Sequence, residues 1–252
     1  MNDFSGKTFL IAGASSGIGK NAAEHFTKNL GANVVLVARR TEIITQLAQA
    51  LPGNNYAITY DFLDLEHIDE IFKECEQQKI YLDGIIYAAG IAPLYPLKEN
   101  DTKLTIDTMK INTLAFAEIA KGVLTSSCMR EQASVVAISS NTSFLTTNRQ
   151  SAYSASKAAL NTYVKYFAKE AMGKYRVNAI LPAAVETEMY QKLREQSPNL
   201  DEKAKKDQPL GVIPPEKVSK TIEFLMSEDS SYMTGNLVFI GGGQFINAIY
   251  PS

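Results

Sequence analysis

Short apolar runs rich in β-branched residues alternate along the chain with longer segments in which apolar residues recur three or four positions apart. Several runs are apolar at consecutive positions, a pattern typical of strands that are covered on both faces. They predict seven strands, at residues 8–12, 33–37, 56–60, 84–88, 134–138, 176–180 and 237–240. The segments between them, such as the one with Ile68, Ile71, Phe72 and Cys75, have the period of helices. This alternation predicts an α/β fold: a doubly wound parallel sheet of about seven strands, with helices on both faces in three layers, αβα.

The composition narrows the class of protein. The 252 residues carry a net charge of −2, with 45% hydrophobic and 21% charged residues, so we expect one domain over residues 1–252 with a full-sized core. The charge balance argues against nucleic-acid binding through bulk positive charge. The two cysteines, Cys75 and Cys128, lie in separate segments, which argues against a disulfide framework or a cysteine-based zinc site. With no signal-peptide pattern and no apolar stretch of about 20 residues, we expect a cytoplasmic protein with no membrane contact.

Residues 186–215 form the most irregular segment, which is rich in Lys, Glu, Gln and Pro. Two interpretations are open, a mobile lid over a site and a solvated insertion. A long polar connection inside a compact domain favours the lid.

A glycine-rich loop follows the first predicted strand. Its spacing is G-x-x-x-G-x-G, and a helical segment, residues 20–30, follows at once. Glycines let the backbone approach a pyrophosphate, and a helix N-terminus offers that group free N–H donors. A plain tight turn uses glycines too, but the position after the first strand favours a dinucleotide site. The loop residues of this site would be Gly13, Ser15, Ser16, Gly17 and Gly19.

The second predicted strand is followed by Arg39 and Arg40. An acidic side chain there would bind the ribose hydroxyls of NAD, whereas guanidinium groups suit the 2′-phosphate of NADP. The missing carboxylate favours NADP(H), with NAD(H) as the second choice; a solvated pair of charges is the alternative. Asp61, after the third strand, could accept from the adenine amino group or could begin a helix.

We predict that the side chains of Ser140, Tyr153 and Lys157 carry out the catalytic chemistry. Tyr153 and Lys157 are four positions apart and share one face of a helix. A tyrosine phenol has a pKa of about 10, which a neighbouring ammonium group lowers toward the range useful for proton transfer. Ser140 ends the fifth strand, at the sheet edge where ligands bind, and could donate to a substrate carbonyl. The alternatives are a strand-end turn at Ser140 and a solvated helix face at Lys157. Asn112 interrupts an apolar helical stretch and is expected to form a specific hydrogen bond.

In this order and spacing, Gly13, Gly17-Ile18-Gly19, Asn112, Ser140 and Tyr153-x-x-x-Lys157 resemble the short-chain dehydrogenase/reductase family over residues 6–243. The resemblance implies a single Rossmann-like domain and reversible hydride transfer between a nicotinamide and a carbonyl or alcohol carbon. It makes Tyr153 the acid/base and Ser140 the residue that orients the substrate oxygen. Lys157 would hold the nicotinamide ribose and lower the tyrosine pKa, and Asn112 would hold a water of the proton relay.

The resemblance also implies cofactor contacts, a substrate pocket and an assembly. The further cofactor residues would be Ile18, Asp61, Phe62, Ala88, Ala89, Gly90, Pro182, Val185 and Thr187. Arg39 matches a position where NADP-preferring members carry a basic residue. Asn141, Gln150 and Met189 flank the catalytic residues and are expected to contact substrate. The resemblance also implies that the protein is a homo-oligomer, either a tetramer or a dimer.

Three positions depart from the family pattern. Ala12 replaces the usual threonine, Tyr87-Ala88-Ala89-Gly90 replaces Asn-Asn-Ala-Gly, and Pro182-Ala183 replaces Pro-Gly. The first two departures remove polar groups that help to tie the first strand to the fourth. They are expected to affect the rigidity of this joint more than the chemistry.

We therefore expect an NADP(H)-dependent carbonyl reductase similar to the 3-oxoacyl-carrier-protein reductases. Its substrate would be a small-molecule carbonyl or alcohol, free or attached to a carrier protein. The alternatives are a reductase of a sugar or secondary-metabolite ketone, and a non-catalytic dinucleotide-sensing protein, against which the intact Tyr153 and Lys157 argue. His25 and His67 have no partners at ligand spacing, so no metal is expected.

Overall fold

In the computed structural model, which describes residues 2–145 and 147–244, seven parallel strands form one sheet in the order β3-β2-β1-β4-β5-β6-β7. Every predicted strand is present, and the doubly wound sheet is confirmed. The strands are β1 (Thr8–Ala12), β2 (Asn33–Ala38), β3 (Tyr56–Thr59), β4 (Leu82–Tyr87), β5 (Met129–Ile138), β6 (Arg176–Pro182) and β7 (Leu237–Ile240).

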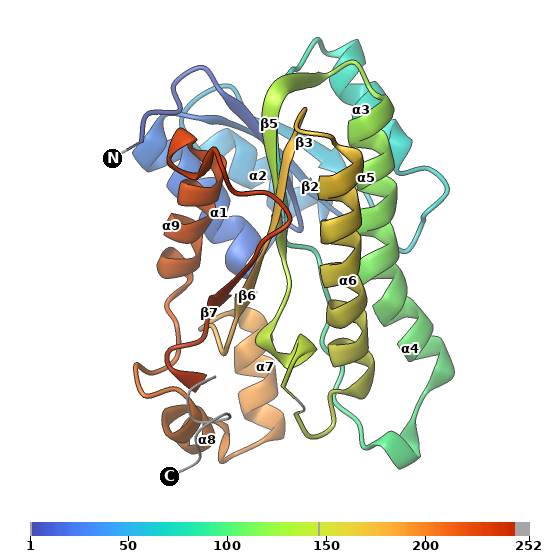
Figure 1. Ribbon diagram of the computed structural model, residues 1–252, viewed down its shortest axis with the longest axis vertical. Coiled ribbons are helices and arrows are strands. Elements are labelled where there is room, and N and C mark those ends of the chain that lie inside the picture. Colours follow the sequence, from blue (N-terminus) through green and yellow to red (C-terminus); the bar gives the residue numbers. More distant parts are fainter. Residues whose placement is uncertain (1, 146, 245–252) are drawn as a thin grey trace.

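Helices cover both faces of the sheet, as Figure 1 shows. One face carries α1 (Gly17–Leu30), α2 (Thr41–Ala50) and α9 (Pro215–Met226). The other carries α3 (Asp69–Gln77), α4 (Thr102–Met109), α5 (Ala115–Thr125) and α6 (Ser151–Glu170). A π-helical turn, residues 110–114, joins α4 to α5. Short 3₁₀ turns occupy residues 97–99, 141–143 and 228–230. The three predicted layers are therefore confirmed.

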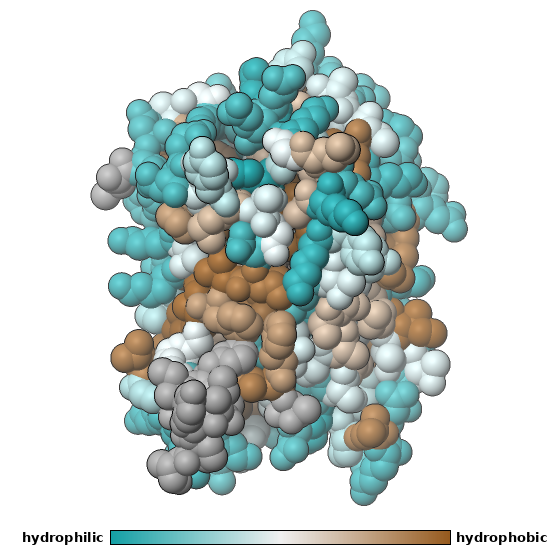
Figure 2. All heavy atoms as spheres, viewed as in Figure 1, coloured by the Kyte–Doolittle hydropathy of each residue, from teal (hydrophilic) through white to brown (hydrophobic). Residues whose placement is uncertain are grey.

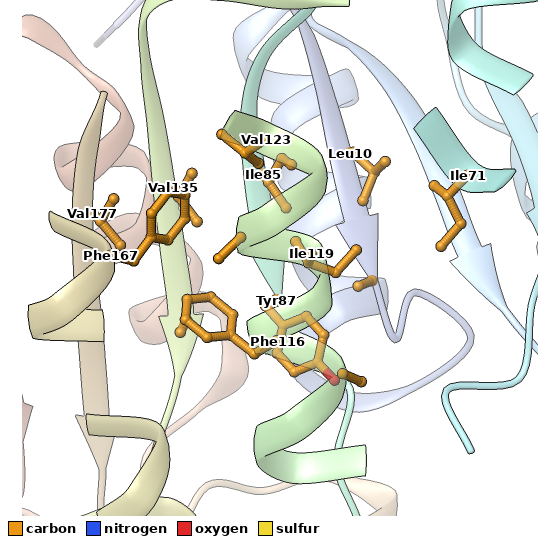
Figure 3. Packing of buried hydrophobic residues seen from close by; sticks show 14 of the residues in the cluster. Leu10, Ile71, Ile85, Tyr87, Phe116, Ile119, Val123, Val135, Phe167 and Val177 are labelled. Atoms are coloured by element: carbon orange, nitrogen blue, oxygen red, sulfur yellow. The ribbon is translucent and has the colours of Figure 1, made fainter. Parts of the chain in front are cut away.

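Two hydrophobic cores, one on each face of the sheet, explain why the strands are apolar at consecutive positions. Leu10 and Ile85 point into the core under α5 and α6, whereas Phe9 and Ile86 point into the core under α1 and α9. Successive side chains of a strand face opposite ways, so a strand covered on both faces needs apolar residues throughout. Figure 3 shows the first of these cores between the sheet and α5.

Strand β5 begins five residues earlier than the sequence pattern indicates, at Met129 rather than Ser134. Its first half carries exposed polar residues at positions 130–132, and Gln132 adopts a φ of 61°. The pairing with β4 shifts register at the same place, between Leu82 and Gly84. A polar, irregular strand start has no apolar period, so the sequence could not reveal it.

Residues 186–215 are more regular than the sequence indicated. They form two helices, α7 (Glu188–Gln196) and α8 (Leu200–Asp207), before α9 begins at Pro215. The Arg194 guanidinium contacts Glu186 on one side, at 2.7 Å, and Asp201 on the other, at 2.9 Å. A bridge between Val185 and Ile213 closes the base of the segment. These ion pairs explain how a polar sequence forms a defined helical unit.

The surface is mixed, and Figure 2 shows apolar side chains gathered over β7. On β7 the Phe239 ring packs against Phe144, with ring centroids 5.4 Å apart. Among the described residues, none of the helices combines the length and apolar content that a membrane span requires.

Candidate active site

The carboxyl ends of the strands gather the predicted site residues at one edge of the sheet, as expected for a parallel sheet. The glycine loop follows β1, residues 88–90 follow β4, and Ser139 and Ser140 follow β5. Helix α6 brings Tyr153 and Lys157 to the end of β5 from the other side. The fold therefore unites Ser140, Tyr153 and Lys157, as the sequence predicted.

Lys157 is the most deeply buried cation of the site, with an exposed fraction of 4%. Its Nζ donates to the carbonyl oxygen of Ile138 at 2.8 Å and lies 5.8 Å from the centroid of the Tyr153 ring. Burial lowers the pKa of Lys157 to about 7. A solvated helix face is therefore excluded for Lys157, and its amine can gain or lose a proton near neutral pH.

Tyr153 is partly buried, and burial raises the pKa of its phenol, while a hydrogen bond with the Ser140 hydroxyl acts in the opposite direction. The phenol is therefore protonated at neutral pH. A protonated phenol is the form that can donate to a developing alkoxide.

The Ser140 hydroxyl lies within hydrogen-bonding reach of the Tyr153 phenol. Its Oγ accepts from the backbone N–H of Thr142 at 3.2 Å and from the Thr142 hydroxyl at 3.0 Å. Its proton can be directed to Asn141 Oδ1, at the long distance of 3.4 Å, or to the Tyr153 phenol. The two accepted bonds fix the Ser140 oxygen and let it donate toward Tyr153, where a substrate oxygen can accept instead.

Asn161 lies one turn beyond Lys157 on the same face of α6, and the sequence pattern did not single it out. Its Nδ2 donates to Ser143 Oγ at 2.8 Å, and that hydroxyl donates to the Ser140 carbonyl at 2.6 Å. Asn161 is 4% exposed, and its Oδ1 has no hydrogen-bond partner among the residues that the structure describes. A polar residue four positions after Lys157 was the available signal, because positions 153, 157 and 161 share one helix face.

Asn112 lies in the π-helical turn and is fully buried. Its Oδ1 accepts from the N–H of Ile91 and its Nδ2 donates to the Ile91 carbonyl, both at 2.9 Å. Nδ2 also donates to Ser156 Oγ, which donates to the Tyr153 carbonyl at 2.7 Å. The specific hydrogen bond expected of Asn112 is confirmed, and it links the loop after β4 to the catalytic helix.

The glycine loop fits a dinucleotide. Gly17 has a φ of 54°, and a side chain there would face Thr187 across the loop. The helix that begins at Gly17 has no side-chain cap from Ser16 and no acidic residue in its first turn. A side chain at Gly90 would meet Asn112 Oδ1 at 3.2 Å and Lys157 Nζ at 3.5 Å. The uncapped N-terminus can receive a phosphate, and the absence of a side chain at Gly90 keeps Asn112 and the Lys157 amine uncrowded.

The two arginines after β2 are both exposed. Arg40 donates from Nε and Nη2 to Ser15 Oγ, at 3.1 and 3.0 Å, and its Nη1 lies 3.8 Å from the Glu188 carboxylate on α7. Arg40 therefore lies against the glycine loop, where the adenosine side of a dinucleotide would be expected.

The residues after β3 have different environments. Asp61 does not begin a helix; its Oδ1 accepts from the N–H of Leu63 at 3.1 Å in an exposed turn. The Phe62 ring is buried and packs edge-on against Tyr87 with centroids 5.7 Å apart. This places the Phe62 side chain in the core and leaves only its backbone for a cofactor contact.

The segment after β6 runs beside the glycine loop. Pro182 ends β6, Val185 is buried in the bridge to Ile213, and Thr187 caps α7. The Thr187 Oγ1 accepts from the N–H of Tyr190 at 3.3 Å and donates to the Val185 carbonyl at 3.2 Å. The structure therefore places Thr187 across from Gly17, at the entrance of α7.

The residues expected to contact substrate are two buried amides and one exposed methionine. Asn141 and Gln150 are buried, whereas Met189 on α7 is 38% exposed. The Asn141 side-chain amide donates to Gln244, which lies 103 positions later in the chain. Gln244 is a second residue that the sequence analysis missed, because no local pattern links it to Asn141. Next to Ser140, the site thus presents carboxamide groups that can bind a polar substrate group.

The described residues contain no group of three or more His, Cys, Asp or Glu side chains that could hold a metal ion. His25 contacts Glu223 at 2.7 Å and His67 contacts Asp64 at 2.9 Å, each as one member of a pair.

Comparisons with known proteins agree with this geometry. A family model described as enoyl-(acyl carrier protein) reductase matches residues 13–244. The 3-oxoacyl-[acyl-carrier-protein] reductase FabG of Thermotoga maritima is 33% identical over 249 residues, which cover 96% of this chain and 98% of that protein. The NAD-dependent glycerol dehydrogenase of Listeria innocua is 30% identical over 242 residues, which cover 95% of this chain and 94% of that protein.

Solved structures have the same architecture. A short-chain dehydrogenase/reductase of the glucose/ribitol dehydrogenase type from Brucella melitensis superposes with a TM-score of 0.90 at 26% identity, covering 97% of this chain and 99% of that one. The NADP-bound structure of ElxO superposes with a TM-score of 0.84 at 28% identity, covering 95% of this chain and 99% of that one. The chain belongs to the short-chain dehydrogenase/reductase family, and it is an NAD(P)-dependent oxidoreductase.

The depressed pKa of Lys157 predicts a characteristic dependence of stability on pH. Between about pH 7 and the ordinary lysine pKa of 10.5, the unfolded chain binds a proton that the folded protein releases, so this group makes stability rise with pH. The quantity to follow is the free energy of unfolding of the wild type minus that of Lys157→Met, both without ligand. We expect this difference to rise by about 1 kcal/mol per pH unit between about pH 7.5 and pH 9. Urea unfolding at several pH values measures this difference.

The control is Lys165→Met, on the exposed side of the same helix, for which we expect a flat difference. Parallel pH profiles of the wild type and Lys157→Met would show that the buried amine keeps its ordinary pKa.

Proposed function

We propose that this protein is an NADP(H)-dependent carbonyl reductase of the 3-oxoacyl-carrier-protein reductase type. The observation that carries the proposal is the convergence of Ser140, Tyr153 and Lys157 at the end of β5, next to a glycine loop and an uncapped helix N-terminus. The likeness to 3-oxoacyl-[acyl-carrier-protein] reductase over nearly the whole chain supports the substrate class. A substrate free in solution and one attached to a carrier protein are both compatible with it.

The proposed chemistry assigns one task to each side chain. When bound, the reduced nicotinamide supplies the hydride that is added to the carbonyl carbon. The Ser140 hydroxyl, which contacts the Tyr153 phenol, donates a hydrogen bond to the carbonyl oxygen and polarises it. The Tyr153 phenol then transfers its proton to the oxygen as negative charge develops there. Lys157, with a pKa of about 7, can return a proton toward Tyr153 at neutral pH.

The cofactor would be held by the same residues that adjoin this site. The free N–H groups at the start of α1 would receive the pyrophosphate, and Lys157 the nicotinamide ribose. Arg39 and Arg40 would bind a 2′-phosphate, since no carboxylate follows β2 to accept from ribose hydroxyls. These two arginines support a preference for NADP(H), with NAD(H) as the alternative.

The helices α7 and α8 support a second part of the proposal, a substrate lid over residues 186–215. Thr187, the N-cap of α7, lies across from Gly17, and Met189 follows it on α7, while the network of Arg194, Glu186 and Asp201 makes the segment a unit that can move as one piece. A sugar or secondary-metabolite ketone is the alternative substrate, favoured by the amides of Asn141 and Gln244 beside Ser140.

We also propose a cytoplasmic homo-oligomer, a tetramer or a dimer. The two cysteines are free thiols, which is typical of a reducing compartment. Exposed aromatic and apolar side chains on α4 and α6, namely Ile106, Tyr163 and Tyr166, support an interface on that face.

The catalytic assignment predicts that Tyr153→Phe loses turnover and keeps cofactor binding. NADPH oxidation is followed with a 3-oxoacyl thioester, a keto sugar and a simple ketone, to find the substrate class that the wild type reduces fastest. With that substrate we expect kcat to fall by at least about 100-fold, because the phenolic proton is missing, while the Kd for NADPH stays within about twofold. Tyr232→Phe, at a fully exposed position, should change neither value. A wild type that binds NADPH and reduces no member of the panel would refute the proposed function.

The cofactor assignment predicts that Arg39→Ala and Arg40→Ala each weaken NADPH binding by about 10-fold or more. The Kd for NADH should stay unchanged, because NADH lacks the 2′-phosphate that the guanidinium groups contact. Fluorescence titration of the purified proteins measures both constants, with Arg130→Ala at the opposite edge of the sheet as the control. Equal affinity of the wild type for the two cofactors would contradict the NADP(H) preference.

The assembly predicts that Tyr166→Glu shifts the protein toward the monomer, because a carboxylate would be desolvated at an apolar interface. Size-exclusion chromatography with light scattering measures the mass, and Tyr232→Glu serves as the control on an exposed loop. A wild type that is monomeric at micromolar concentration would overturn this part of the proposal.

A further inference from the structure

A tyrosine stands at the end of β4 where the family pattern has an asparagine, and its hydroxyl performs a task of its own. Tyr87 is fully buried, and its Oη donates to the backbone carbonyl of Ile111. Its ring packs edge-on between Phe62 and Phe116, with centroids 5.7 and 5.5 Å away. Figure 3 shows the rings of Tyr87 and Phe116 next to each other beneath α5.

The carbonyl that Tyr87 contacts has lost its usual helical donor. In an α-helix the N–H of Ala115 would donate to Ile111, but in the π-helical turn it donates to Lys110 instead. A buried carbonyl without a donor is costly, so the turn needs a donor from elsewhere. The Tyr87 hydroxyl supplies it, and burial raises the pKa of this phenol, which keeps it protonated and able to donate.

The same turn presents Asn112, the residue directly after Ile111. Asn112 holds the loop after β4 through two hydrogen bonds to Ile91, and it reaches Tyr153 through Ser156. If the turn relaxed to ordinary helical bonding, Asn112 would rotate on the helix surface and could not make these contacts together. The orientation of Asn112 thus depends on the π-helical turn, and the turn on a donor for Ile111.

We propose that Tyr87 is a positioning residue: its hydroxyl stabilises the π-helical turn at residues 110–114 and thereby orients Asn112 toward Ile91 and Ser156 beside the catalytic tyrosine. This inference rests on the proposed reductase function for its effect on turnover. Its effect on the turn itself does not depend on that function. Tyr87 thus ties the end of β4 to the turn between α4 and α5, directly before Ala88, whose N–H donates to the Ala12 carbonyl of β1 at 2.8 Å.

The test is Tyr87→Phe, which keeps the ring in the aromatic core and removes only the hydroxyl. Tyr175→Phe is the matched control, because Tyr175 is equally buried but precedes β6 at the opposite edge of the sheet. In the ligand-free proteins, hydrogen exchange of peptides covering residues 109–116 should be several-fold faster in Tyr87→Phe than in the wild type and in Tyr175→Phe. This readout needs neither cofactor nor substrate.

With the substrate that the wild type reduces fastest, we expect kcat of Tyr87→Phe to fall by about five- to tenfold, at an unchanged KM and NADPH Kd. A general loss of stability would not separate kcat from KM in this way. In an Asn112→Ala background the same substitution should cause no further loss, because Tyr87 acts through Asn112.

Three results would overturn the inference. They are unchanged exchange at residues 109–116, equal effects of Tyr87→Phe and Tyr175→Phe, or full additivity of Tyr87→Phe and Asn112→Ala in kcat. If the wild type reduces no substrate, the proposed function fails, and the exchange measurement alone still decides whether Tyr87 holds the turn.

Discussion

The buried amine of Lys157, held against the last carbonyl of β5, is the contact on which the arrangement of the site depends. Lys157 Nζ reaches from α6 to Ile138, and the Ser139 hydroxyl reaches back from the strand to the Lys157 carbonyl at 3.3 Å. These reciprocal bonds fix the height of α6 over the sheet, and with it the distance from Tyr153 to Ser140. Desolvating an amine is unfavourable, which lowers its pKa, and the two apolar cores supply the stability that this requires.

A continuous polar layer lies between this contact and the apolar core beneath it. Asn161 and Ser143 hold the turn of Ser140, and Asn112 and Ser156 hold the backbone of Tyr153. Nearly every polar atom of the layer has a partner, as a low dielectric demands, and the unpartnered Asn161 Oδ1 is an exception among the described residues. Rigid support of this kind holds a few side chains in a fixed mutual geometry.

The fold was predictable because the sheet is covered on both faces. Each strand must then be apolar along its length, and a run such as residues 33–37 is distinct from the helical period around it. The same logic fails where a strand leaves the core, as at Met129, and where a helix is held by ion pairs, as at Arg194. The convergence of Ser140, Tyr153 and Lys157 could be predicted because strand ends and helix spacing are local properties. Helix spacing also gives the face on which Asn161 lies, but not its partner Ser143, and no local pattern indicates the contact of Gln244 with Asn141.

The sequence by itself determined the parallel sheet and the edge at which Ser140, Tyr153 and Lys157 meet, because periodicity and spacing record which face of each element is buried. Only the tertiary structure decided which distant group each polar side chain meets. It brought Gln244 to Asn141, Arg40 to Ser15, and the Tyr87 hydroxyl to a carbonyl left without a helical donor. Contacts of this kind depend on how loops and helices pack after the chain has folded, and no local pattern of residues encodes them.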